Sequence, residues 1–225
     1  FSAVAASRVQ PGAHAAIRPF TLIFLDGDLS IGAYSEISSF TLVYGSSDFV
    51  VGAESYVGPQ SLINAEEPVR IGAGSALGPR SMVFTHGSYL PITEGYWVRM
   101  AGVTVGDRVW CAAGVFLHPG VEIGDNSFVN SASVVTQSLP PGSVAEGNPA
   151  RVTYPMARVQ RKMGPRQVDL ALERTLADFA EIGLRRQLKV DSVDQTPGCL
   201  RFAYRGRRYC VLLVRSDGQT PQGPD

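Results

Sequence analysis

The sequence predicts a mainly β fold, a parallel β-helix followed by a small C-terminal α+β appendage. An aliphatic residue recurs every six positions with a small residue four later, as in the run from Ile71 through Gly72 to Ser75. Such a period is too long for one strand and too short for a helical repeat, and it fits a coil of three short strands joined by tight turns. Equivalent points recur first every twenty and later every eighteen residues: Pro11, Ile31, Val51, Ile71, Val105, Ile123 and Pro141.

The regular step is broken once, between Ile71 and Val105. The excess falls at about residues 87–102, directly after His86, and predicts a loop extruded from the coil. Residues that bind or catalyse are often carried by such loops on a rigid scaffold.

Charge is divided unevenly along a chain whose net charge is zero. Residues 1–155 hold seven Lys or Arg against twelve Asp or Glu, and residues 156–225 hold thirteen against eight. This change at the end of the repeat indicates two units. We expect a β-helix over 1–155, a helix with a β-hairpin over 156–215, and a disordered tail over 216–225.

Three widely spaced cysteines, Cys111, Cys199 and Cys210, favour a reducing compartment over a disulfide framework. We see no apolar run of membrane length and no secretory leader. We therefore expect a cytoplasmic protein with no membrane span, and we expect no nucleic-acid partner.

The repeat, its interruption after His86, and the closing segment Gly147-Asn148-Pro149-Ala150-Arg151 together resemble the hexapeptide-repeat acyltransferases, and within them the sugar and polysaccharide O-acetyltransferases. The resemblance covers about residues 9–155. It implies a left-handed coil, acetyl-CoA as the acyl donor, a homotrimer, and active sites between neighbouring subunits.

His86 is the candidate general base. Imidazole titrates near neutral pH, so it can take the proton of an attacking hydroxyl and return it to the departing thiol. The resemblance likewise implies a catalytic histidine beside an extended loop. The alternative is a histidine that only caps a corner of the coil.

Two residues of the preceding coil are expected close to this histidine. A twenty-residue step places Glu66 under His86, where the carboxylate could orient the imidazole, and Asn64 under Phe84. Glu66 could instead be a solvated corner carboxylate. Asn64 could bind an acceptor hydroxyl or cap its own turn.

The extruded loop is expected to shape the acceptor site, since its aromatic side chains can stack on a sugar and Glu94 can accept from hydroxyls. They could equally bury the loop against the next subunit, and Arg99 could pair with Glu94. The candidate acceptor-binding residues are Asn64, Phe84, Tyr89, Glu94, Tyr96 and Trp97.

The later coils resemble the donor half of the family, where small residues let the pantetheine arm of CoA lie along the backbone. The Asn-Pro segment and Arg151 are expected near the adenine end, where a cation can meet phosphate. The candidate donor-binding residues are Trp110, Ala112, Ala113, Asn130, Ser131, Asn148, Pro149 and Arg151.

The remaining reactive side chains are given structural interpretations. Cys111 sits at an inward position and is expected to be buried and inert. His14 is expected on the surface. His118 could suggest the zinc site of γ-class carbonic anhydrases, but the residue five positions on is Ile123, so three ligands cannot be assembled and no metal is expected.

Beyond Pro155 the repeat stops. Helical spacing predicts an amphipathic helix over about 165–186, and alternation predicts strands at 188–190, 200–204 and 209–213, the last two a hairpin turning at Arg205-Gly206. The arginines of this hairpin could dock an anionic partner, or the positive unit could pack on the negative β-helix.

The sequence therefore predicts an acetyl-CoA-dependent O-acyltransferase that transfers directly to a sugar or glycan hydroxyl. One alternative is N-acylation of a nucleotide-linked amino sugar on the same scaffold. The other is a non-catalytic β-helix that binds or assembles.

Overall fold

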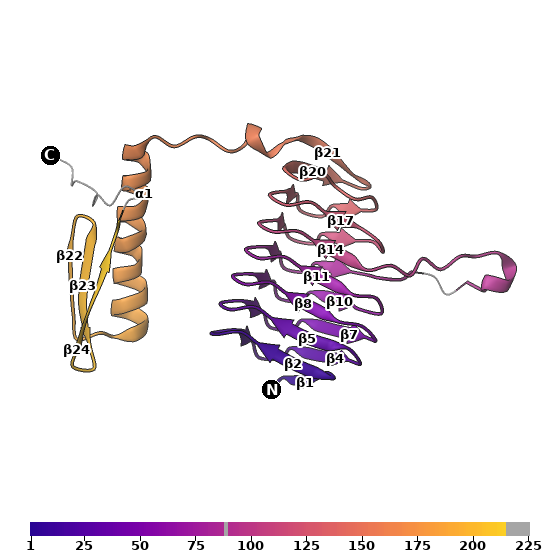
Figure 1. Ribbon diagram of the computed structural model, residues 1–225, viewed down its shortest axis with the longest axis horizontal. Helices are drawn as coiled ribbons and strands as arrows, with labels where there is room; N and C mark the ends of the chain where they lie inside the picture. The colour runs from indigo at the N-terminus through magenta and orange to yellow at the C-terminus, as the bar shows by residue number, and fades with distance from the viewer. Residues whose placement is uncertain (88–89, 215–225) are drawn as a thin grey trace. The chain divides into compact units, whose positions relative to one another are not determined.

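The computed structural model describes residues 1–87 and 90–214, and it divides the chain into two compact units, Phe1–Gln160 and Arg161–Asp225. The first unit is a parallel β-helix in which each coil contributes one strand to each of three sheets (Figure 1). The second is a helix with a three-stranded antiparallel sheet. The predicted fold class is confirmed.

The three sheets of the β-helix run along its length, and strands three apart in sequence lie side by side, except at the end of the third sheet, where the last strand pairs antiparallel with the one before it. The first contains β1 Ala3–Ala5, β4 Leu22–Leu25, β7 Leu42–Gly45, β10 Leu62–Asn64, β13 Met82–Val83, β16 Phe116–Leu117 and β19 Val134–Val135. The second contains β2 Arg8–Pro11, β5 Asp28–Ile31, β8 Phe49–Val51, β11 Val69–Ile71, β14 Val103–Val105 and β17 Glu122–Ile123. The third contains β3 Ala16–Ile17, β6 Glu36–Ile37, β9 Tyr56–Val57, β12 Ala76–Leu77, β15 Trp110–Cys111, β18 Phe128–Val129, β20 Ser143–Gly147 and β21 Ala150–Pro155.

The interior is filled by one inward residue from each short strand. In the first sheet Ile23, Val43, Ile63 and Val83 stand in register, and each has no exposed surface. Each coil can cover its apolar side only with the next one, so the β-helix is stable as a stack and not as single coils. This requirement produces the six-residue aliphatic period.

The small residue of each repeat has a bonding role at the corner. Ser55 Oγ donates to the carbonyl of Gly72 at 2.7 Å and also accepts from the N–H of Ser75 at 3.2 Å, so it joins one coil to the next. A serine hydroxyl supplies both functions in the space of a single atom. At Gly72 itself, an added Cβ would lie 2.5 Å from the carbonyl carbon of Gly106, so any side chain there would collide with the next coil.

The extruded loop leaves the stack after β13 and returns at β14. Its base is closed by the N–H of Ala101, which donates to the carbonyl of Thr85 at 2.9 Å. It carries a 3₁₀ turn, η1 Ile92–Glu94, and projects from the β-helix (Figure 1). Another short 3₁₀ turn, η2 Met156–Arg158, follows β21.

In the second unit, α1 Pro165–Asp178 continues into a wider, π-helical segment, η3 Phe179–Leu188. Its sheet contains β22 Ser192–Thr196, β23 Cys199–Tyr204 and β24 Arg207–Leu212. Leu176, Ala180, Leu184 and Leu200 form its buried core. None of the helices in the described part of the chain is long and apolar enough to cross a membrane.

The predicted hairpin is confirmed, with Arg205 and Gly206 at positive φ in its turn. The strand expected at 188–190 is wrong, because Leu188 ends the helix and Lys189 takes φ 49°. The strand instead is β22, whose sequence Ser-Val-Asp-Gln-Thr has a single apolar residue and therefore no alternation to detect. The tail at 216–225 lies outside the described residues.

Candidate active site

His86 stands where the chain leaves the coil, directly after Thr85 and three residues beyond the end of β13. Its imidazole is half-buried, and the residue beneath it is Asn64, at the end of β10, which has no exposed surface. His86 Nδ1–H donates to Asn64 Oδ1 at 2.8 Å. A neutral imidazole that donates through Nδ1 keeps the lone pair of Nε2 available, which is the form that a general base requires.

Asn64 is itself held from several sides. Its Oδ1 also accepts from the hydroxyl of Thr85 at 2.9 Å and from the N–H of Thr85 at 3.4 Å. Its Nδ2 has no hydrogen-bond partner among the described residues. Buried and fixed behind His86, Asn64 orients the imidazole and is not placed to meet an acceptor directly.

The expected pairing of Glu66 with His86 is not what the structure shows. Glu66 Oε2 accepts from Ser46 Oγ at 2.7 Å, one coil back, and the group facing the imidazole is the amide of Asn64. The twenty-residue register holds as far as Ile63 opposite Val83. Beyond that pair the chain turns outward into the loop, so the step no longer relates residue 66 to residue 86.

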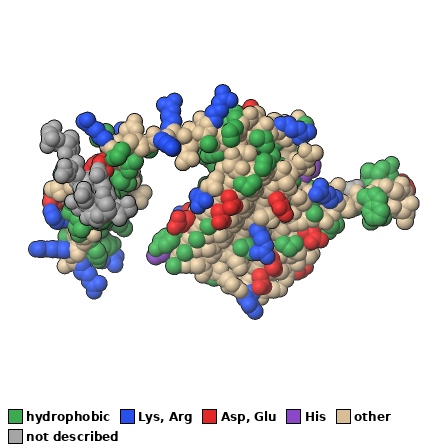
Figure 2. Space-filling model, turned by 45° about the horizontal axis from the view of Figure 1, so that its top comes forward, with side chains coloured by type: hydrophobic (Ala, Val, Ile, Leu, Met, Phe, Trp, Pro, Cys, Tyr) green, Lys and Arg blue, Asp and Glu red, His purple; other side chains and the backbone are tan. Residues whose placement is uncertain are grey.

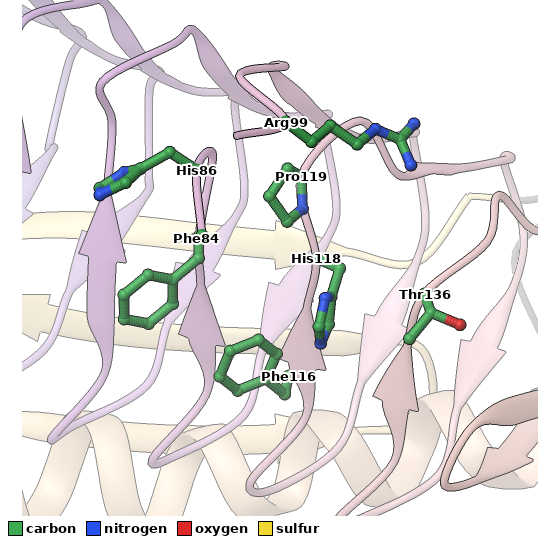
Figure 3. Close-up of a pocket in the computed structure, with 8 residues that line it drawn as sticks. Phe84, His86, Arg99, Phe116, His118, Pro119 and Thr136 are labelled. Carbon is green, nitrogen blue, oxygen red and sulfur yellow. The ribbon is translucent and has the colours of Figure 1, made fainter. Parts of the chain in front are cut away.

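A hollow of about 260 Å³ opens beside His86 on the side of the following coils (Figure 3). The rings of Phe84 and Phe116 stack in its wall with centroids 5.4 Å apart, and His118 lies 4.9 Å from Phe116. Its full lining is Phe84, His86, Gly87, Arg99, Phe116, His118, Pro119 and Thr136. Aromatic faces beside two imidazoles and a guanidinium form a site that can hold a polar ring against a base.

Six of these lining residues are not among the predicted site residues: Gly87, Arg99, Phe116, His118, Pro119 and Thr136. His118, expected at a corner of the coil, follows Leu117, which pairs with Val83, and its ring contacts Phe116, which in turn stacks on Phe84. The signal was available, because the longer step from Ile71 to Val105 also separates residue 84 from residue 118. Among the described residues no three His, Cys, Asp or Glu side chains gather to hold a metal ion.

The other predicted acceptor residues lie on the loop and do not line the hollow. Glu94, Tyr96 and Trp97 are exposed, Trp97 by 86%, and Tyr89 lies outside the described residues. Figure 2 shows hydrophobic side chains gathered at the tip of the projecting loop. Glu94 and Arg99 do not form an ion pair in the described part of the chain. The guanidinium of Arg99 instead lies against Gly120, in the space that a Cβ would take.

The predicted donor residues are distributed along the later coils and the closing turn. Trp110 is 58% exposed and packs edge-on to Phe128, while Ala113 is exposed and Ala112 is buried. The remaining members are the exposed Asn130, Ser131, Asn148, Pro149 and Arg151. They lie on the same unit as His86 but do not line its hollow.

The amide of Asn130 is already used within the protein, since its Nδ2 donates to Glu146 at 3.0 Å and its Oδ1 accepts from the N–H of Ser131. Cys111 is fully buried as expected, and burial raises the pKa of its thiol to about 12. It is therefore a packing residue and not a nucleophile at neutral pH.

No family model matches the chain. Galactoside O-acetyltransferase of Escherichia coli K12 is 48% identical over 50 residues, which are 22% of this chain and 25% of that protein. WcaF of the same organism, named as a colanic acid biosynthesis acetyltransferase, is 38% identical over 66 residues, 29% of this chain and 36% of its own. The chain thus spans about a quarter to a third of the length of these curated relatives.

Among solved structures, a variant of AntD, an N-acyltransferase from Bacillus cereus, superposes with a TM-score of 0.56 at 18% identity over 76% of this chain and 90% of that one. That structure holds coenzyme A and dTDP-4-amino-4,6-dideoxyglucose, and the likeness concerns the fold. The repeat with its single interruption, the β-helix that it forms and these partial relatives make the chain similar to the hexapeptide-repeat acetyltransferases.

Proposed function

We propose that the protein is an acetyl-CoA-dependent O-acyltransferase that moves an acetyl group directly to a hydroxyl of a sugar or glycan. The observation that carries the proposal is the contact between His86 Nδ1 and Asn64 Oδ1, which leaves the lone pair of Nε2 available on a residue that lines the aromatic hollow. The partial likeness to galactoside and colanic acid acetyltransferases supports the substrate class.

In this mechanism Nε2 of His86 takes the proton from the acceptor hydroxyl as its oxygen attacks the thioester carbonyl. The resulting imidazolium keeps its Nδ1–H on Asn64 and then gives the Nε2 proton to the departing CoA thiolate. No covalent enzyme intermediate forms, and no step calls on a metal ion. Asn64 is the positioning residue and takes over the role that the sequence suggested for Glu66.

The acceptor would bind in the hollow, stacked on Phe84 and contacted by His118 and Arg99. Tyr96, Trp97 and Glu94 contribute only if the loop meets a bound acceptor or a neighbouring subunit. Because its tip exposes Ile92 by 62% and Trp97 by 86%, we propose that a second copy of this chain covers it.

A homotrimer with sites between subunits is part of the proposal. The outward residues of the first sheet form an apolar row: Leu22, Leu42, Leu62, Met82, Phe116 and Val134. The outward row of the second sheet is polar by comparison: Gln10, Ser30, Val50, Arg70, Thr104 and Glu122. The apolar face of the first sheet suits packing against copies of this chain, and the polar face of the second sheet suits contact with water.

The test is a screen of mono- and oligosaccharides with acetyl-CoA, read by mass for addition of one acetyl group. Mild hydroxylamine then separates the two chemistries, since it cleaves an ester and leaves an amide intact. An ester product on a neutral sugar supports the proposal. An amide formed only on a nucleotide-linked amino sugar would establish the N-acyl alternative, and CoA release with no acceptor in a broad screen would contradict both.

A further inference from the structure

Two thiols lie side by side on the outer face of the small C-terminal sheet. Cys199 Sγ in β23 and Cys210 Sγ in β24 are 3.5 Å apart. The register pairs Arg201 with Cys210 and Cys199 with Leu212, so the cysteines are diagonal neighbours on one face. The opposite face carries Leu200, which packs on the helix.

The two thiols differ in accessibility. Cys210 is exposed, whereas Cys199 is 7% exposed. An accessible thiol can attack a disulfide from solution, and a buried neighbour within reach can then displace what has been attached. The third cysteine, Cys111, is in the interior of the β-helix and takes no part.

A hollow of about 360 Å³ adjoins Cys210 on this face. Arg201 and Arg208 line it beside Ala203, whose side chain is small. Asp194 stands opposite Arg201 in the register and is the one carboxylate in the lining. Neither arginine forms an ion pair in the described part of the chain, so the hollow favours an anionic ligand.

We propose that Cys210 and Cys199 form a dithiol exchange site for an anionic low-molecular-weight disulfide of the glutathione disulfide class, which Arg201 and Arg208 hold by its carboxylates. This site does not depend on acyl transfer at His86, so the proposal can be tested independently of the proposed function.

The exchange balances in two steps. Cys210 thiolate attacks one sulfur of glutathione disulfide, a protein–glutathione disulfide forms, and the released glutathione thiolate takes up the proton that Cys210 lost. Cys199 then attacks Cys210 Sγ, the protein disulfide forms, and the second glutathione leaves with the proton of Cys199. The protein loses two hydrogens and two electrons, and one glutathione disulfide becomes two glutathiones.

The geometry allows the second step with a small movement. A disulfide has a sulfur–sulfur length of about 2.0 Å, so the two Sγ atoms, now 3.5 Å apart, must close by about 1.5 Å. Side-chain rotation of the exposed Cys210 can supply this. The Cys199–Cys210 disulfide would join β23 to β24 in a unit whose buried core consists of four residues, so it is expected to stabilise that unit against unfolding.

The test uses the full reduced chain, incubated with glutathione disulfide, then denatured, alkylated with N-ethylmaleimide and weighed intact. The contact with Cys199 raises the pKa of Cys210, so the reaction is run at mildly alkaline pH. We expect one remaining alkylation, at Cys111, and a disulfide peptide joining residues 199 and 210. Cys199→Ser should instead accumulate a stable adduct of one glutathione, and Cys210→Ser should give neither product.

Ligand charge is tested with a matched pair of disulfides. The double variant Arg201→Gln, Arg208→Gln should slow exchange with glutathione disulfide by about tenfold at low salt, while exchange with neutral hydroxyethyl disulfide stays within about twofold. Cys111→Ser is the control and should behave as the parent chain.

Two outcomes overturn the proposal. If the native chain keeps all three thiols free under conditions in which the denatured chain reacts, the dithiol site does not exist. If both disulfides react equally with the parent and with the arginine variant, the site takes no anionic ligand.

Discussion

Replacing Asn64 tests whether the amide behind His86 sets the imidazole for catalysis. Asn64→Ala removes the side-chain acceptor of the His86 Nδ1–H and of the Thr85 N–H, while the hydroxyl of Thr85 can still donate to the backbone carbonyl of residue 64. A hydrogen bond of this kind contributes about 1 kcal/mol, and 1.4 kcal/mol corresponds to a factor of ten, so we expect kcat to fall by about five- to tenfold. The buried donors left unsatisfied should also lower the free energy of unfolding by about 1–3 kcal/mol.

Asn64→Asp is the informative companion, because it keeps an acceptor of the same shape and adds a negative charge 2.8 Å from the ring. A neighbouring carboxylate favours the imidazolium over the neutral imidazole. His86 acts as a base only when unprotonated. The acidic limb of the kcat/KM profile should therefore move to higher pH, so that activity is lost near neutral pH but recovered in alkaline solution.

The assay is steady-state thiol release from acetyl-CoA with a saturating acceptor across a range of pH, with thermal unfolding measured on each variant. Glu66→Gln is the matched control, since Glu66 contacts Ser46 and is expected to leave the profile in place. An Asn64→Asp enzyme with the parent pH profile, or an Asn64→Ala enzyme with full turnover, would refute the positioning role.

Three further predictions concern assembly, the corners of the coil and the loop. Light scattering should report about three times the 24.1 kDa chain mass. Leu62→Asp in the apolar row should reduce that mass while the circular dichroism spectrum stays typical of β structure. An active monomer would contradict the inter-subunit site. Ser55→Ala should lower the free energy of unfolding by about 1–2 kcal/mol, because the Ser55 hydroxyl links two coils. Thr93→Ala on the exposed loop is the control and should change it little. Equal effects of the two variants in denaturant titrations would show that the Ser55 hydroxyl does not stabilise the stack. Trp97→Ala should raise the acceptor KM several-fold with the KM for acetyl-CoA unchanged, and an unmoved acceptor KM would show that the loop does not reach the acceptor.

The β-helix could be predicted almost completely, because its stacked interior restricts which residues can occupy the inward positions and the corners. Most inward positions are filled by aliphatic side chains, with Phe49 and Cys111 as exceptions, and the corners carry small residues, so the period can be read from residues such as Ile63 and Ser75. The insertion after His86 followed from the same regularity, since a strict repeat makes any departure visible.

The partner of His86 could not be predicted by the same reasoning. A fixed step assumes that both coils keep their register, and this holds only up to Val83. Once the chain turns outward, contacts depend on the path of the exit, which brought Asn64 beneath His86 in place of Glu66. His118 shows the opposite case, because the longer step already relates residue 118 to residue 84, so its place beside the hollow could be predicted from the sequence.

The C-terminal unit was predictable where its residues alternate and not elsewhere. β23 and β24 carry apolar residues at every second position, whereas β22 is polar and is a strand because it pairs with β23. The proximity of Cys199 and Cys210 also depends on that pairing, since eleven positions separate them in sequence.

The most direct test of the central claim is thiol release from acetyl-CoA by the parent chain and by His86→Ala, each with the acceptor found in the screen. Loss of a general base costs about 10²–10⁴-fold in rate, and we expect a loss of that size with the affinity for acetyl-CoA and the melting temperature close to the parent values. Turnover that survives this substitution, in a variant shown to be folded and to bind acetyl-CoA, would contradict the assignment of His86 as the base.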